Sequence, residues 1–177
     1  MLRWILALLL ASVAVFHGRA VLAQGFASAF PAPVEQRVET YSGDAEPGTI
    51  EIHTQSRKLY FILPDGRALR YPVGVGRLGK QWYGSTRIVE KRLSPAWTPP
   101  AVMRGDKPAV VIPAGAKNNP MGAAALVLAD NELAIHGTND PASIGHFASW
   151  GCIRMHNRHV LDLYDRIKDG TRVVITR

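Results

Sequence analysis

From Thr49 to its end, the chain consists largely of short β-forming segments, each followed by a turn signal. Residues 49–53 alternate polar and apolar side chains, and residues 58–63 are rich in aromatic and β-branched residues. Pro64-Asp65-Gly66 separates this second segment from residues 67–75, and we expect a β-hairpin there because Pro presets φ and Gly accepts a positive φ. The remaining predicted strands are residues 86–91, 109–112, 124–128, 132–136 and 171–176, with a second turn at residues 130–131.

One segment near the C-terminus has helical periodicity. Its apolar positions are Val160, Leu161, Tyr164 and Ile167. Asn157 is a favourable N-cap residue, and Gly170 is a typical helix stop. We therefore expect a mostly β fold, a mixed β domain with one C-terminal helix packed on it, followed by a last strand.

The first 23 residues have the organisation of a signal peptide. Arg3 is followed by an apolar run at residues 5–16, which is 12 residues long, whereas a membrane-spanning helix needs about 20. Val21-Leu22-Ala23 fits a signal-peptidase site, so we expect cleavage after Ala23; an uncleaved anchor is the alternative. Residues 24–48 contain several prolines and no sustained periodicity, which predicts a flexible tether before a domain at residues 49–177.

Charge and cysteine content limit the classes of function that the chain can have. Removal of residues 1–23 lowers the formal net charge from +7 to +5, and the positive charge is diffuse, with no basic helix or aromatic-interleaved motif. Export and this diffuse charge both disfavour nucleic acid as a partner. Cys152 is the only cysteine. In an oxidising compartment a lone cysteine cannot form an internal disulfide, which favours a reactive thiol over an inert buried one.

The segment from Ile135 to Asn157 places this cysteine among candidate bases. His136, at the end of a predicted strand, is the best candidate because a general base must be held within about 3 Å of its partner. Gly151 permits a tight turn before the nucleophile, where backbone N–H groups can form an oxyanion hole. Arg154 can hold a carboxylate, or instead form a structural ion pair with Asp140, Asp162 or Asp165.

The other histidines of this segment, His146, His156 and His159, have the simpler interpretation of polar surface residues. Together with Cys152 they include zinc ligand types, but no paired ligand spacing appears and there is no second cysteine, so we expect no metal or other cofactor.

These residues resemble the catalytic signature of the YkuD-domain L,D-transpeptidases of the ErfK/YbiS/YcfS/YnhG type. The signature stands here as His136-Gly137-Thr138-Asn139, Pro141, Ile144-Gly145 and Ser149-Trp150-Gly151-Cys152-Ile153-Arg154-Met155. The resemblance runs from about residue 49 to residue 176. Further similar segments are residues 58–60, 71–76, 95–100 (PAWTPP), 119–122 (NPMG) and 161–174.

The resemblance implies a YkuD-like β-sandwich or mixed β fold and a Cys/His acyl transfer on peptidoglycan stem peptides. By this resemblance, Cys152 is the nucleophile, His136 is the base, and the carbonyl of Gly137 orients the imidazole. Ser149, Gly151 and Arg154 then shape the substrate site. The acyl-enzyme formed by releasing D-alanine passes to an acceptor amine, on a second stem or on an envelope lipoprotein.

Three segments depart from the family pattern. Residues 81–86 occupy the place where the family usually has Thr-Pro-x-Gly. Pro113-Ala114-Gly115 replaces the usual Pro-Gly-Gly. Trp150 occupies a position where His or Lys is common, so it can alter acceptor choice but supplies no proton. These departures leave the predicted chemistry intact and put the acceptor in question.

Two alternative functions remain open at this stage. A hydrolase would use water as acceptor and act as a carboxypeptidase or amidase. A non-catalytic envelope-binding module would keep the fold and is expected to lose Cys or His, but both Cys152 and His136 are present. The predicted compartment is the periplasm or cell envelope, with no membrane span after signal cleavage.

Overall fold

The computed structural model describes residues 37–129 and 133–177. The predicted signal peptide, the start of the predicted tether and the predicted turn at residues 130–131 lie outside these ranges. Among the described residues, no helix has the length and apolar character needed to cross a membrane.

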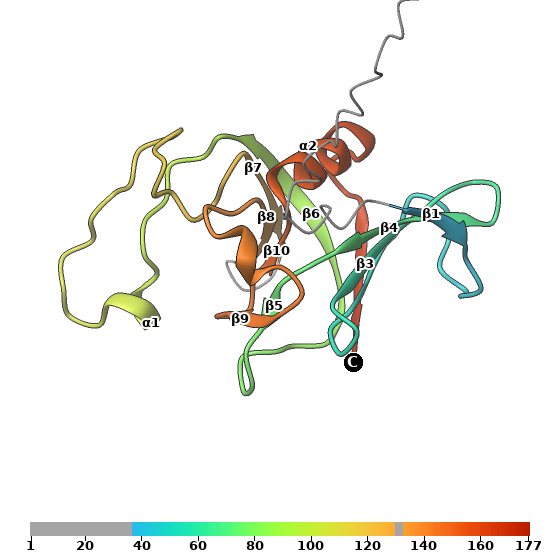
Figure 1. The fold of residues 1–177 in the computed structure, drawn as a ribbon, viewed down its shortest axis with the longest axis horizontal. Helices are drawn as coiled ribbons and strands as arrows, with labels where there is room; N and C mark the ends of the chain where they lie inside the picture. The colour runs from blue at the N-terminus through green and yellow to red at the C-terminus, as the bar shows by residue number, and fades with distance from the viewer. Residues whose placement is uncertain (1–36, 130–132) are drawn as a thin grey trace, which may run out of the picture. The chain divides into compact units, whose positions relative to one another are not determined.

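Nine strands form one mixed sheet in the order β1-β4-β3-β2-β11-β6-β7-β8-β10 (Figure 1). Two further strands, β5 and β9, pair with each other. The strands are β1 (Arg37–Thr40), β2 (Ile50–His53), β3 (Lys58–Ile62), β4 (Arg67–Pro72), β5 (Val75–Gly76), β6 (Gly84–Leu93), β7 (Ala124–Leu128), β8 (Ala134–His136), β9 (Phe147–Ser149), β10 (Ile153–Arg154) and β11 (Arg172–Thr176). The helices are α1 (Ala101–Arg104), a single 3-10 turn at Pro141–Ser143, and α2 (Asn157–Arg166).

The predicted hairpin is confirmed, since β3 and β4 pair antiparallel with Phe61 opposite Leu69. The C-terminal strand β11 is central: it runs parallel to β2 and antiparallel to β6. It thereby joins the N-terminal strands to β6, β7, β8 and β10, and β8 and β10 carry His136 and Arg154 of the signature.

The core lies between the sheet and α2, where the apolar face of the helix packs on β7 and β8. Val160 and Leu163 are fully buried there, and Leu161, on the outer side of the helix, is 38% exposed. The predicted mostly β class with one main helix is confirmed. Figure 1 shows that the short α1 lies away from α2, in the long segment between β6 and β7.

The structure corrects three predictions. Residues 37–40, predicted to belong to a flexible tether, form β1, because they pair along the edge strand β4 from Arg37↔Arg70 to Thr40↔Arg67. Residues 109–112 form no strand; only an isolated bridge joins Ile112 to Trp97, since Pro108 and Pro113 flank this segment and limit its pairing.

The third correction concerns the start of α2. His156 occupies the N-cap position and makes no side-chain cap hydrogen bond, and Asn157 is the first helical residue. The side chain of Asn157 instead bonds to two neighbouring loops, described below.

Candidate active site

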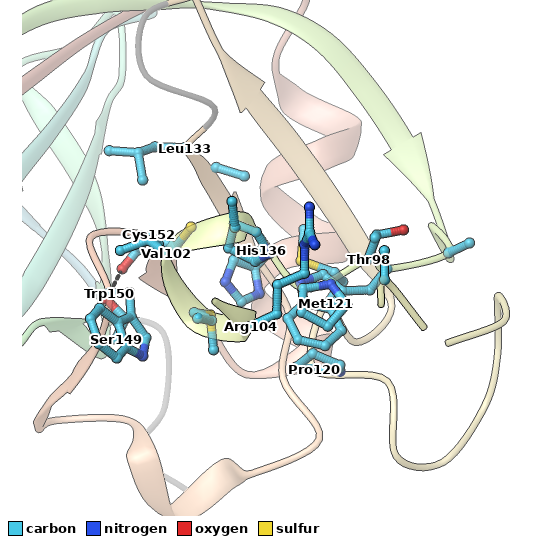
Figure 2. Close-up of a pocket in the computed structure, with 18 of the residues that line it drawn as sticks. Thr98, Val102, Arg104, Pro120, Met121, Leu133, His136, Ser149, Trp150 and Cys152 are labelled. Atoms are coloured by element: carbon cyan, nitrogen blue, oxygen red, sulfur yellow. Dashed lines mark hydrogen bonds between the residues drawn. The ribbon is translucent and has the colours of Figure 1, made fainter. Parts of the chain in front are cut away.

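Two parallel strands bring the predicted nucleophile and base together. β8 and β10 pair with Ile153 opposite Ile135 and Arg154 opposite His136. Because side chains alternate between the faces of a strand, Cys152, two residues before Arg154, points to the same side as His136 and Arg154. All three line one cavity of about 870 Å³, and Figure 2 shows the Cys152 and His136 side chains in it.

His136 is 4% exposed, and its Nδ1 lies 2.6 Å from the carbonyl oxygen of Gly137. A carbonyl oxygen only accepts hydrogen bonds, so Nδ1 carries the proton and Nε2 of the neutral ring has a free lone pair. Burial lowers the pKa of His136 to about 4, with the positive charge of Arg154 acting in the same direction and the carbonyls of Gly137 and Pro120 opposing. At neutral pH the ring is therefore neutral and able to accept a proton.

Cys152 is partly buried. Burial raises the pKa of its thiol, while a backbone hydrogen bond at Ala134 and the charge of Arg154 act in the opposite direction. The resting side chain is therefore a neutral thiol, and it needs a base to become the nucleophilic thiolate. The pair is consistent with proton transfer from Cys152 to His136 when a substrate arrives.

The turn before Cys152 is fixed by Ser149, which is 2% exposed. Its hydroxyl donates to the carbonyl of Cys152 at 2.6 Å and accepts from the N–H of Gly151 at 3.0 Å. Gly151 has φ +131, and a Cβ there would lie 3.2 Å from the Leu133 side chain. The predicted need for glycine is thus met, but the N–H of Gly151 is already engaged and is not free for an oxyanion.

Arg154 lies inside the cavity wall with its Nε buried and without a hydrogen-bond partner. Its backbone N–H and C=O both bond to Gly74, at 2.8 and 2.9 Å, which fixes the base of the side chain. Among residues 37–129 and 133–177, it forms no ion pair with the three aspartates proposed as structural partners, and Asp162 instead pairs with Arg166. A buried, unpaired guanidinium nitrogen in this position suits a ligand carboxylate.

The opposite wall of the cavity comes from the excursion between β6 and β7. Its lining residues there are Ala96–Arg104, which include α1, together with Ala109, Pro120 and Met121. The buried side chain of Asn119 fastens the two ends of this excursion, donating to the carbonyls of Pro95 and Pro113 at 2.8 and 3.0 Å. In Figure 2, Thr98 lies at one end of the cavity lining and Trp150 at the other.

Comparison with known proteins shows the family of the chain. Residues 47–175 match the family model YkuD, described as the L,D-transpeptidase catalytic domain. The chain belongs to this family.

Several curated proteins are similar in sequence to this chain. "Probable L,D-transpeptidase YbiS" of Escherichia coli K12 is 37% identical over 136 residues, which cover 70% of this chain and 43% of that protein. "Putative L,D-transpeptidase YkuD" of Bacillus licheniformis is 35% identical over 134 residues, covering 75% of this chain and 68% of that protein. The chain thus spans less than half the length of the first of these relatives.

Solved structures show the same fold at low identity. L,D-transpeptidase 3 from Mycobacterium tuberculosis, solved with a faropenem-derived adduct, has a TM-score of 0.60 at 14% identity, over 73% of this chain and 60% of that one. An L,D-transpeptidase from Mycobacterium smegmatis has a TM-score of 0.58 at 12% identity, over 73% of this chain and 58% of that one.

The YkuD domain of this chain contains one bracing residue that sequence reasoning assigned wrongly. Oδ1 of Asn157 accepts from the N–H groups of Thr138 and Ala123, at 2.9 and 3.1 Å, and its Nδ2 donates to the Thr138 carbonyl at 3.1 Å. A Cβ on Gly137 or Gly122 would lie 2.2 Å from Oδ1, so both glycines are needed for this approach. Asn157 thereby holds the loop whose Gly137 carbonyl orients His136.

The remaining histidines of the YkuD domain lie outside the cavity lining. His146 is exposed, as predicted. His156 is partly buried and His159 is 3% exposed, so the prediction of surface positions is wrong for His159, which faces the Tyr71 ring in the core. In the described part of the chain, no three His, Cys, Asp or Glu side chains gather as metal ligands would.

Proposed function

We propose that the chain is an exported L,D-transpeptidase that acts on peptidoglycan stem peptides in the periplasm or cell envelope. The observation that carries the proposal is the shared cavity wall of Cys152, His136 and Arg154, with Nδ1 of His136 held by the Gly137 carbonyl at 2.6 Å. This geometry, in a domain of the YkuD family, supports acyl transfer through a thioester.

In the first half-reaction, Nε2 of His136 takes the thiol proton. Sγ of Cys152 then attacks the carbonyl of the bond that joins the third residue of a tetrapeptide stem to the terminal D-alanine. His136 then returns the proton to the amine of the departing D-alanine, which leaves a thioester. The buried side chain of Arg154 is suited to hold a carboxylate of the donor, and Ser149 and Gly151 keep the nucleophile's turn in shape.

In the second half-reaction, an acceptor amine attacks the thioester carbonyl and regenerates the thiol. A second stem gives a crosslink, an envelope lipoprotein gives an attached protein, and water gives hydrolysis. We propose the second stem as the principal acceptor.

The test is mass spectrometry of the purified protein with tetrapeptide-stem muropeptides, beside a Cys152→Ala variant. We expect a mass increase on the wild-type protein equal to the stem without D-alanine, followed by a crosslinked dimer, and neither product from the variant. Loss of D-alanine without a dimer would identify a hydrolase. Activity in the Cys152→Ala protein would refute the mechanism.

A further inference from the structure

Two cations flank the aromatic ring next to the nucleophile. The guanidinium carbon of Arg77 lies 3.4 Å from the centre of the Trp150 ring, and Nζ of Lys80 lies 5.2 Å from it. Trp150 is 37% exposed, and it lines the cavity two residues before Cys152. We call Arg77, Lys80 and Trp150 the cation–aromatic patch.

Backbone hydrogen bonds attach this patch to the nucleophile's turn. β5 pairs with β9, and the N–H of Arg77 donates to the Ser149 carbonyl at 3.0 Å. The N–H of Lys80 in turn donates to the Arg77 carbonyl at 2.8 Å. Gly76 is required here, because a Cβ would lie 2.5 Å from the Lys80 carbonyl oxygen. The backbone that carries the two cations is therefore held beside the turn that precedes Cys152.

The patch has no acidic partner within the described ranges. Other arginines of the domain are neutralised by carboxylates, as in Arg70 with Glu39 and Arg166 with Asp162. Neither Arg77 nor Lys80 forms such a pair in residues 37–129 and 133–177. An arginine stacked on an aromatic ring keeps its N–H groups at the ring edge available for an anion.

Most of the patch lies outside the lining of the cavity. The cavity already contains a cation, Arg154, whereas Arg77 and Lys80 lie outside its lining and reach it only through Trp150. The two cations of the patch therefore lie at the rim of the cavity, next to Trp150. A second ligand that approaches Cys152 from this rim meets two unpaired positive charges.

We propose that the cation–aromatic patch is the acceptor site and selects an amine whose carbon also bears a free carboxylate. This inference rests on the proposed transpeptidase function. The carboxylate binds Arg77 and Lys80, and the neighbouring amine is thereby directed to the thioester carbonyl. Water has no such handle, so the patch favours transfer over hydrolysis.

The same charges assist the chemistry of the acceptor. Only a neutral amine can attack, and nearby cations disfavour the ammonium form, so they lower the pKa of the bound acceptor amine. The amine nitrogen forms the new C–N bond, the C–S bond breaks, and neutral His136 takes the surplus amine proton and returns it to the Cys152 thiolate. Bonds and protons balance without a further reactant.

The experiment separates the two half-reactions. The protein is first acylated with a tetrapeptide donor stem, and release of the acyl group is then followed with two acceptor stems. One acceptor contains diaminopimelate with its side-chain carboxylate free, and the other has that carboxylate amidated. The variants are Arg77→Gln/Lys80→Gln and the charge reversal Lys80→Glu. The matched control is Lys168→Gln/Arg172→Gln, which removes two exposed charges outside the cavity lining.

We expect the wild-type protein to prefer the free carboxylate by about tenfold, the effect of one exposed charge-assisted contact. Arg77→Gln/Lys80→Gln should abolish this preference, raise KM for the free-carboxylate acceptor and shift the pH dependence of acceptor attack upward. Lys80→Glu should reverse the preference, and the control should retain it. Two outcomes would overturn this inference alone. In one, the wild-type protein is acylated but uses both acceptors equally. In the other, the variants keep the wild-type preference. Failure to acylate Cys152 at all would overturn the proposed function.

Discussion

At the residue scale, the proposed chemistry depends on the environment of two neutral groups, the His136 ring and the Cys152 thiol. Burial lowers the pKa of His136 to about 4 and raises that of Cys152, so both shifts oppose a resting thiolate–imidazolium pair. In the proposed mechanism, the thiol stays neutral at rest, and the neutral ring of His136 can accept its proton over a wide pH range. The hydrogen bond from Nδ1 to the Gly137 carbonyl fixes which nitrogen accepts the proton.

Replacing His136 with Gln should lower the rate of acyl-enzyme formation by about 10³-fold, because the thiol loses its general base while a hydrogen-bonding side chain remains. In the wild-type protein, the rate should fall only as pH drops toward about 4, since protonation below this pKa removes the acceptor lone pair. Rates of acylation measured by mass spectrometry from pH 4 to pH 8 check both. A half-maximal rate near pH 6.5 would contradict the buried environment derived for His136.

At the scale of elements, the start of α2 is a support for the catalytic loop. Asn157 connects this helix to the loops after β8 and before β7 through three hydrogen bonds. The glycines at positions 122 and 137 let the backbone of both loops approach the Asn157 side chain closely, since a Cβ at either position would collide with it. A small displacement of this loop moves the Gly137 carbonyl and with it the imidazole ring.

Asn157→Ala should lower the acylation rate by about 10- to 100-fold, because misplacement of a base by a fraction of an ångström weakens catalysis. It should also reduce the free energy of unfolding by about 1–3 kcal/mol, since the backbone N–H and carbonyl of the buried Thr138 lose their hydrogen-bond partner. Asn157→Asp keeps the two accepting interactions and should retain an intermediate rate. Asn118→Ala, an exposed asparagine in the loop before β7, is the matched control and should behave as wild type. Equal rates for Asn157→Ala and this control would show that the bracing is dispensable.

At the scale of the whole molecule, two buried histidines couple stability to pH. His136 and His159 are 4% and 3% exposed, and burial is the main cause that lowers the pKa of each to about 4, from 6.5. In the unfolded chain both bind protons near pH 6.5, so the unfolded state takes up more protons between pH 6.5 and pH 4. The folded state is therefore favoured fully above pH 6.5 and loses this contribution as pH falls.

The free energy of unfolding should decrease by about 2 kcal/mol per histidine between pH 7 and pH 5. His159→Gln should halve this dependence without affecting the cavity, because His159 does not line it. Urea unfolding at several pH values provides the measurement, and the window above pH 5 avoids titration of carboxyl groups such as Asp162, whose pKa lies below its ordinary value. A flat profile in wild type would mean that these rings bind protons in the folded protein as readily as in the unfolded chain.

The sequence alone determined the β-rich class, the hairpin at Pro64-Asp65-Gly66, the strand at residues 124–128 and the pairing of Cys152 with His136. These features depend on local turn chemistry, on strand periodicity and on a closely spaced signature, all of which a linear pattern carries. It also supplied the Gly137 carbonyl as partner of the imidazole, through the family resemblance.

Only the tertiary structure decided the features that depend on distant segments. β1 forms because the edge of β4 is available for pairing. The sequence of residues 37–40 does not predict this pairing. Asn157 was predicted to be the N-cap because asparagine is a favourable residue there. Its side chain instead bonds to loops at residues 122–123 and 137–138, which are distant in sequence. The charges beside Trp150 come from a loop about 70 residues earlier, brought there by pairing of β5 with β9. Non-local pairing and burial, rather than local propensity, fix such contacts.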